Sequence, residues 1–232
     1  MWLVASSELT DLAVIRDGKP ALWRDLRRFN APIQLAVGAA HEVITRAVSP
    51  TEAAIISLAP CQSGSPEVHR WIRETAEGGT ARVNPTYTLH CVDNLALSVL
   101  SIGIKNHAWA MSLGGASGMA WSALELALER DEREVLVFGG DQVTPYEVSP
   151  IAAFAMLFAR EMTAHVTTGR PTRLVGVDRQ PKSHATHPHA ASGMIAMLAA
   201  LRSAPIGHFA YVVPAADSDG RDEIVVRWEV LA

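Results

Sequence analysis

The stretch DNLALSVLSIGIKNHAWAMSLGGASGMAWSALELALERDEREVLVFGGD, residues 93–141, decides the fold class. In residues 93–104 the apolar and small side chains recur every three or four positions, which is typical of a helix packed on a core. Residues 108–113 predict a short strand, and a glycine turn separates it from a second helical stretch, 117–132. The continuous apolar run 135–138 indicates a strand buried on both faces. This succession predicts an α/β fold with a mostly parallel sheet packed between helices.

The segments on either side extend the same pattern. Upstream, the run 55–60 predicts a buried strand, and a helix is expected to begin at Pro66 and to end at Gly78. The Ala-, Met- and Phe-rich segment 149–161 fits either a helix or a bridging strand. Further downstream the sequence predicts a strand over 173–177, a helix over 190–201, and a hairpin of two strands, 208–213 and 223–230. We expect a single domain over residues 1–232.

Composition excludes several functional classes. The chain has 232 residues with 20 Lys and Arg against 24 Asp and Glu, a formal net charge of −4. A protein without a basic excess is not expected to bind nucleic acid. No apolar stretch reaches the roughly 20 residues of a membrane span, and the N-terminus lacks the basic segment of a signal peptide. Two cysteines, Cys61 and Cys91, do not make a disulfide framework. We therefore expect a cytoplasmic protein.

Three motifs resemble the N-terminal half of a β-ketoacyl synthase. Gly103-Ile104-Lys105 matches the corner that ends a helix in that family, and the turn 114–118 matches the Ala-Cys-x-Ser-Gly turn that carries the nucleophile. Gly139-Gly140 matches the glycine pair after the next strand. The segment 85–96 is similar to short ketosynthase-like proteins, with Asp93 in place of the usual histidine. The resemblance covers residues 50–142 and implies a thiolase-like half-fold, βαβαβ.

The resemblance also implies that the catalytic centre is lost. Gly115 stands where that family has its cysteine, and an alignment shifted by two residues places Ser117 there. In a condensing ketosynthase a thiolate at a helix N-terminus attacks the acyl thioester, and glycine has no side chain to do so. The chain is also too short for a complete second half with the family's histidines. It therefore resembles a catalytically inactive partner of the chain-length-factor type.

What the resemblance implies about partners is specific. We expect a heterodimer with a full-length ketosynthase in type II polyketide, fatty-acid-like or aryl polyene biosynthesis. The acyl carrier protein is expected to dock on that ketosynthase. No cofactor is expected. The strand 108–113 is expected to pair across the interface, because an exposed strand edge must be covered. The residues expected at the interface or at the acyl tunnel are Asn94, Val99, Leu100, Asn106, His107, Trp109 and Met111.

Two other functions remain open from the residues alone. A stand-alone acyltransferase or thioesterase would use Ser117 or Cys91 as its nucleophile, although Ser117 also fits a helix N-cap and Cys91 a small buried residue. A metal- or small-molecule-binding module would use the histidines of the loop 182–189, whose spacing allows zinc binding. No cysteine or carboxylate stands close in that loop to complete a ligand shell. These weak metal candidates are His184, His187 and His189.

Overall fold

The computed structural model describes most of the chain. The described residues are 1–59, 65–79, 94–114, 119–142, 151–162, 170–181, 190–214 and 222–232. Within them, no helix is long and apolar enough to cross a membrane.

A mixed sheet forms the centre of the protein. Its strands are β1 (Trp2–Leu9), β2 (Ala54–Leu58), β3 (Ala110–Leu113), β4 (Glu134–Gln142), β5 (Ile151–Ala159), β6 (Thr172–Pro181), β7 (Gly207–Pro214) and β8 (Asp222–Val230). The eight strands of the described residues follow the order β3-β2-β4-β5-β1-β6-β8-β7. Among these residues β2 runs parallel to β3 and to β4, whereas the other five pairings are antiparallel. The predicted α/β fold, a sheet packed between helices, is confirmed, whereas the prediction that this sheet is mostly parallel is wrong.

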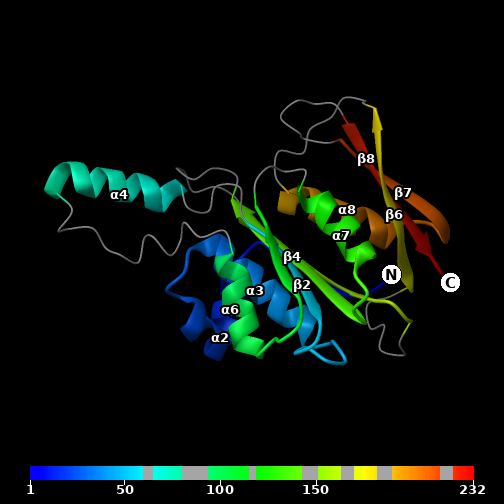
Figure 1. Cartoon of the computed structure of the whole chain (residues 1–232), viewed down its shortest axis with the longest axis horizontal. Coiled ribbons are helices and arrows are strands. Elements are labelled where there is room, and N and C mark those ends of the chain that lie inside the picture. Colours follow the sequence, from blue (N-terminus) through cyan, green and yellow to red (C-terminus); the bar gives the residue numbers. More distant parts are fainter. Residues whose placement is uncertain are drawn as a thin grey trace.

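Helices cover the sheet on two sides. They are α1 (Ala13–Gly18), α2 (Pro20–Leu26), α3 (Ala31–Ile44), α4 (Ser65–Gly78), α6 (Leu95–Ile104), α7 (Met119–Glu129) and α8 (Ala190–Ser203). Helices α2, α3 and α6 lie on one face of β2 and β4, and α7 and α8 lie on the other (Figure 1). Helix α4 stands clear of the layers (Figure 1).

The layer of α7 and α8 lies between two parts of the sheet. One core cluster joins apolar residues of these two helices with residues of β2, β4 and β5 on one side and of β6 and β8 on the other (Figure 1). The Trp228 ring of β8 stacks on Phe158 of β5, with 6.3 Å between the centroids. The two parts meet where β1 pairs with β6, over two residue pairs only. This short contact lets the sheet change direction and enclose the helices.

Strand β5 shows why these layers form. Its side chains are apolar on both faces, and they alternate between the two cores. Ala153, Ala155 and Leu157 pack toward α3, whereas Phe154 and Phe158 pack toward α7 and α8. Within the segment 149–161, which fitted a helix or a strand, residues Ile151–Ala159 are thus a central strand between β4 and β1.

Strand β4 passes very close to α3. The sequence predicted a strand over 135–138 with the pair Gly139-Gly140 after it, but β4 continues to Gln142 and contains both glycines. A Cβ on Gly140 would lie 2.5 Å from the carbonyl oxygen of Pro32 and 3.1 Å from the Cβ of Ala36. Gly140 therefore serves close backbone packing inside the sheet.

Buried Glu134, at the start of β4, fixes the turn that follows α3. Its carboxylate accepts hydrogen bonds from the backbone N–H groups of Val48 and Ser49, at 3.0 and 3.2 Å. These bonds satisfy two donors of a turn that lies next to the core.

The other predicted elements are confirmed with small changes of their ends. The helices predicted at 93–104 and 117–132 are α6 and α7, and the helix that begins near Pro66 is α4. The predicted C-terminal hairpin is the antiparallel pair β7 and β8. The thiolase-like half predicted as βαβαβ corresponds to β2, α6, β3, α7 and β4.

Candidate functional site

Strand β3 forms one edge of the sheet. It pairs with β2 on one side, and no other described strand pairs with it. Trp109 and Leu113 pack against the α7 core, and Met111 between them is 41% exposed. Since side chains alternate along a strand, these three residues form a row on the α7 side of the open edge.

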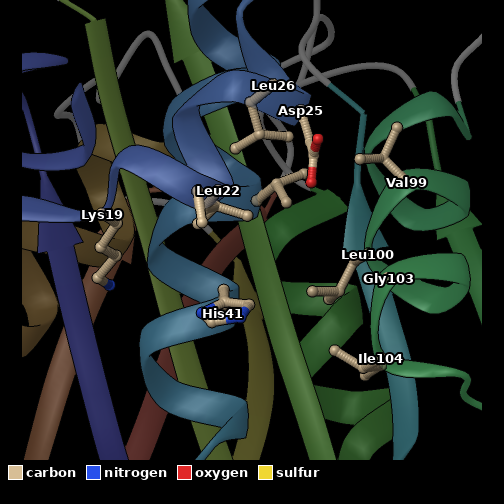
Figure 2. A pocket seen from close by; sticks show the side chains of 11 residues that line it. Lys19, Leu22, Asp25, Leu26, His41, Val99, Leu100, Gly103 and Ile104 are labelled. Carbon is tan, nitrogen blue, oxygen red and sulfur yellow. The ribbon is translucent and has the colours of Figure 1, made fainter.

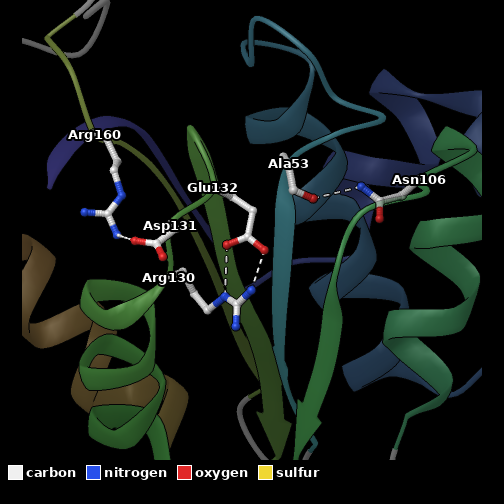
Figure 3. Close-up of polar contacts among 6 residues, drawn as sticks. All are labelled: Ala53, Asn106, Arg130, Asp131, Glu132 and Arg160. Atoms are coloured by element: carbon white, nitrogen blue, oxygen red, sulfur yellow. Dashed lines mark hydrogen bonds and ion pairs between the residues drawn. The ribbon is translucent and has the colours of Figure 1, made fainter.

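The Trp109 ring is held in place by the ion pair of Arg130 and Glu132. The Arg130 guanidinium lies 4.1 Å from the ring centroid. Arg130 in turn donates two hydrogen bonds to the Glu132 carboxylate, at 2.9 and 2.5 Å, as Figure 3 shows. The hydrogen bond from Arg130 lowers the pKa of the Glu132 carboxyl, so the pair stays charged at neutral pH. The ring therefore offers a fixed apolar surface at the start of β3.

Asn106 and His107 fasten the corner between α6 and β3. The Asn106 side-chain amide donates to the carbonyl of Pro50 at 3.2 Å and to that of Ala53 at 2.9 Å. Figure 3 shows the bond to Ala53. The His107 backbone N–H donates to the carbonyl of Thr51. Lys105 takes the left-handed conformation, with φ 54°, that ends the helix. Two predicted interface residues thus tie the corner to the turn before β2.

The remaining predicted residues lie on α6, on the opposite side of the sheet. Asn94 is an exposed N-cap residue that makes no side-chain capping bond. Val99 and Leu100 line a cleft between α2, α3 and α6 with a volume of about 450 Å³ (Figure 2). The predicted tunnel set is therefore divided: Trp109 and Met111 lie on the α7 face, and Val99 and Leu100 lie on the α3 face.

The candidate nucleophiles and metal ligands lie outside the described residues. This holds for Gly115 and Ser117, which precede α7, and for Cys91. The loop histidines His184, His187 and His189 lie outside them as well. Within the part of the chain that the structure describes, no group of three or more His, Cys, Asp and Glu residues could hold a metal ion.

Sequence reasoning did not single out Arg130 and Glu132. The only signal in the sequence is the run of charged residues, 129–134, at the end of the predicted helix 117–132. Only the fold shows that this helix end lies beside Trp109. The cleft also escaped notice, because sequence reasoning placed no element before residue 50, where α2 and α3 lie, and because α6 is far from them in the sequence.

The layered arrangement identifies the fold. A mixed sheet that encloses α7 and α8 and carries α3 and α6 on its outer side is the thiolase-like fold of ketosynthases and chain length factors. The structure is similar to "The ishigamide ketosynthase/chain length factor", with a TM-score of 0.62 and 11% identity over 100% of this chain and 99% of that chain. It is also similar to the ketosynthase ApeO in complex with its chain length factor ApeC from Xenorhabdus doucetiae, with a TM-score of 0.59 and 17% identity over 88% of this chain and 79% of that chain. No protein-family model matches the sequence, and no curated protein matches it.

Proposed function

We propose that this protein is a non-catalytic, chain-length-factor-like subunit that pairs with a full-length ketosynthase. The observation that carries the proposal is the likeness to a ketosynthase/chain length factor structure over 100% of this chain and 99% of the other. In the proposal, residues 1–232 form a single ketosynthase N-terminal-like domain that acts in the cytoplasm, in type II polyketide or fatty-acid-like biosynthesis. The acyl carrier protein docks on the ketosynthase and not on this subunit.

The open edge of β3 is the proposed centre of the interface. An exposed edge presents unpaired backbone N–H and C=O groups, and a partner strand would satisfy them. Met111, which is 41% exposed beside the fixed Trp109 ring, would be covered by the same contact. A strand edge of four residues is too small by itself, because a stable interface buries about 800 Å² on each partner.

Helix α4 supplies the additional surface. Its apolar residues Trp71 and Ile72 are 44% and 57% exposed, one helical turn from Thr75 and Ala76 on the same side. Figure 1 shows α4 standing away from the layers, so this stripe is available to a second chain. We assign it to the same ketosynthase, because the edge strand alone does not provide enough contact area.

In this complex the subunit acts by shape. Trp109, fixed by Arg130, and Met111 would form part of the wall at the far end of the acyl tunnel. Each methylene that is pushed against such a wall costs about 1–3 kcal/mol, enough to set a product length. Val99 and Leu100 do not join this wall, because α6 lies on the other face of the sheet.

The test is purification of the tagged protein from its own host, with identification of the partner by mass spectrometry and light scattering for stoichiometry. Recovery of a ketosynthase of about twice this length, in a one-to-one complex, supports the proposal. Met111→Lys and the pair Trp71→Glu with Ile72→Lys should each weaken the complex about 10- to 100-fold, since each removes a buried apolar contact. Ile102→Lys is the matched control, because Ile102 is 78% exposed on α6 and should not affect the complex. Recovery of the chain alone would refute the proposal.

The two other functions from the sequence are tested with the same preparation. Covalent labelling of Ser117 or Cys91 by an acyl thioester would identify an acyltransferase or thioesterase. A metal-dependent rise in thermal stability that is lost when His184, His187 and His189 are replaced would identify a metal-binding module. The chain-length-factor function predicts neither result.

A further inference from the structure

The cleft between α2, α3 and α6 has the form of a small-molecule site. Its volume of about 450 Å³ lies within the roughly 300–1,000 Å³ range of ligand pockets. Leu26, Val37 and Leu100 form its buried floor. Leu22 and Val99 flank the opening, as Figure 2 shows. The walls are therefore aliphatic and come from three helices that pack on the sheet.

Polar groups lie at the two ends of the cleft (Figure 2). Lys19 and His41 lie at one end, and Asp25 lies at the other. Burial, and then the charge of Lys19, lower the pKa of the His41 imidazole, so that His41 is neutral at pH 7 and can donate or accept a hydrogen bond. The Lys19 ammonium lies 3.6 Å from the Glu42 carboxylate, which is longer than a hydrogen bond.

The opposite end carries less effective charge. The Asp25 carboxylate is largely exposed and lies 3.8 Å from Arg24, so solvent and its neighbour screen it. At the Lys19 end the ammonium lies 3.6 Å from the Glu42 carboxylate, which does not line the cleft. Lys19 is less exposed than Asp25, so its charge is less screened by solvent, and it lies beside the neutral, hydrogen-bonding His41 ring. This charge distribution favours a ligand with an anionic head at the Lys19 end and an aliphatic tail along α6.

We propose that this cleft binds an amphipathic carboxylate, a free medium-chain fatty acid. The carboxylate would lie against Lys19 and His41, and the tail would lie between α2 and α6. The site is separate from the β3 edge, because α6 and Met111 lie on opposite faces of the sheet, and it does not depend on the pairing with a ketosynthase.

Gly103 provides a variant that fills the cleft without harming the fold. It lines the cleft on α6, and a Cβ at this position would meet nothing within 4 Å. Gly103→Leu should therefore occupy the opening and also raise the helix propensity of α6. Gly103→Ala fills less of the same space and gives a graded comparison. Lys19→Gln removes the cation, and Arg16→Gln is its control, because Arg16 is exposed and pairs with Asp17 outside the cleft.

The experiment measures binding of decanoate, decanol and decyltrimethylammonium to the full chain by isothermal titration calorimetry, below their micelle concentrations. We expect saturable one-to-one binding of decanoate, lost at least about tenfold in Gly103→Leu, with unchanged or higher thermal stability. Lys19→Gln should weaken decanoate about three- to fivefold and leave decanol unaffected, and Arg16→Gln should change neither.

Three outcomes would overturn the assignment. The first is an absence of saturable decanoate binding to the unaltered chain. The second is binding of decyltrimethylammonium as tight as that of decanoate, which would contradict the charge argument. The third is a dimer, seen by light scattering, that dissociates in Gly103→Leu, because the cleft would then be a contact between two copies of the chain.

Discussion

Replacement of Gly140 by alanine tests the closest contact between the sheet and its outer helices. A Cβ at this position would lie 2.5 Å from the Pro32 carbonyl oxygen, so the two backbones must separate by at least 0.5 Å to reach the 3.0 Å below which real Cβ contacts are essentially absent. The obstacle is the backbone of the first turn of α3, which cannot rotate away as a side chain can. Overpacking of this kind costs about 1–3 kcal/mol. We expect a loss of about 2 kcal/mol, or a fall in Tm of about 4–8 °C for a domain of this size.

Thermal and urea unfolding followed by circular dichroism would measure this loss. Gly103→Ala is the matched control, because its Cβ meets nothing within 4 Å and the same change in a helix stabilises by about 0.5–1 kcal/mol. The two alanine variants should therefore move Tm in opposite directions. An unchanged or raised Tm for Gly140→Ala would show that α3 and β4 are not in such close contact, and the reasoning would be refuted.

Three further predictions concern the polar contacts that hold the site in place. Asn106→Ala should lower the free energy of unfolding by about 1–2 kcal/mol, since it removes both side-chain hydrogen bonds to the turn before β2. Asn106→Asp should lower it further, because it places a carboxylate oxygen against those carbonyls. Urea unfolding of both variants would measure these losses. Glu134→Gln should cost about 1–3 kcal/mol, because an amide oxygen can accept at most part of the two backbone bonds of this buried carboxylate; a variant with an unchanged unfolding midpoint would contradict this. His41 holds its proton less tightly in the folded chain than in the unfolded chain, so stability that is fully present above the ordinary pKa of 6.5 should fall as the pH decreases through that value. Tm measured at about pH 7.5 and about pH 5.5 should show a smaller difference in His41→Gln than in the unaltered chain, and equal differences would refute this role of His41.

The sequence predicted elements well where a pattern is local. Helices α6 and α7 and the strands between them have the periodicity and the glycine turn that mark their ends. Sequence reasoning placed no element before residue 50, although Asn30 and Pro32 mark the start of α3, where the Asn30 side chain accepts from the Ile33 N–H.

The sheet direction could not be read from periodicity. The wholly apolar β5 has no period of two, so its sequence alone does not distinguish it from a buried helix. The direction of β5 relative to β4 could, however, have been predicted from the length of the segment that connects them. Only the eight residues 143–150 separate β4 from β5, fewer than the dozen or more that a parallel crossover needs. The antiparallel pairing of β4 with β5 follows from that length.

The candidate site was predicted as a set of residues but not as a surface. Val99, Leu100, Trp109 and Met111 lie within thirteen positions of the sequence, yet the chain passes from a helix on one face to a strand whose row points to the other. Sequence distance across such a corner does not say which face a side chain occupies. The Arg130 contact to Trp109 depends in addition on the return of α7 along the sheet, which only the folded structure gives.

The separation of the two faces makes the two proposals independent of each other. Met111→Lys changes the β3 edge on the α7 face, so it should weaken the ketosynthase complex and leave decanoate binding unchanged. Gly103→Leu fills the cleft on the α3 face, so it should abolish decanoate binding and leave the complex intact. Parallel titrations of both variants distinguish these cases. If Met111→Lys loses both ketosynthase binding and decanoate binding and its Tm falls, the cause is a general loss of structure. If it loses both at an unchanged Tm, the assignment of the two surfaces to opposite faces of the sheet is contradicted.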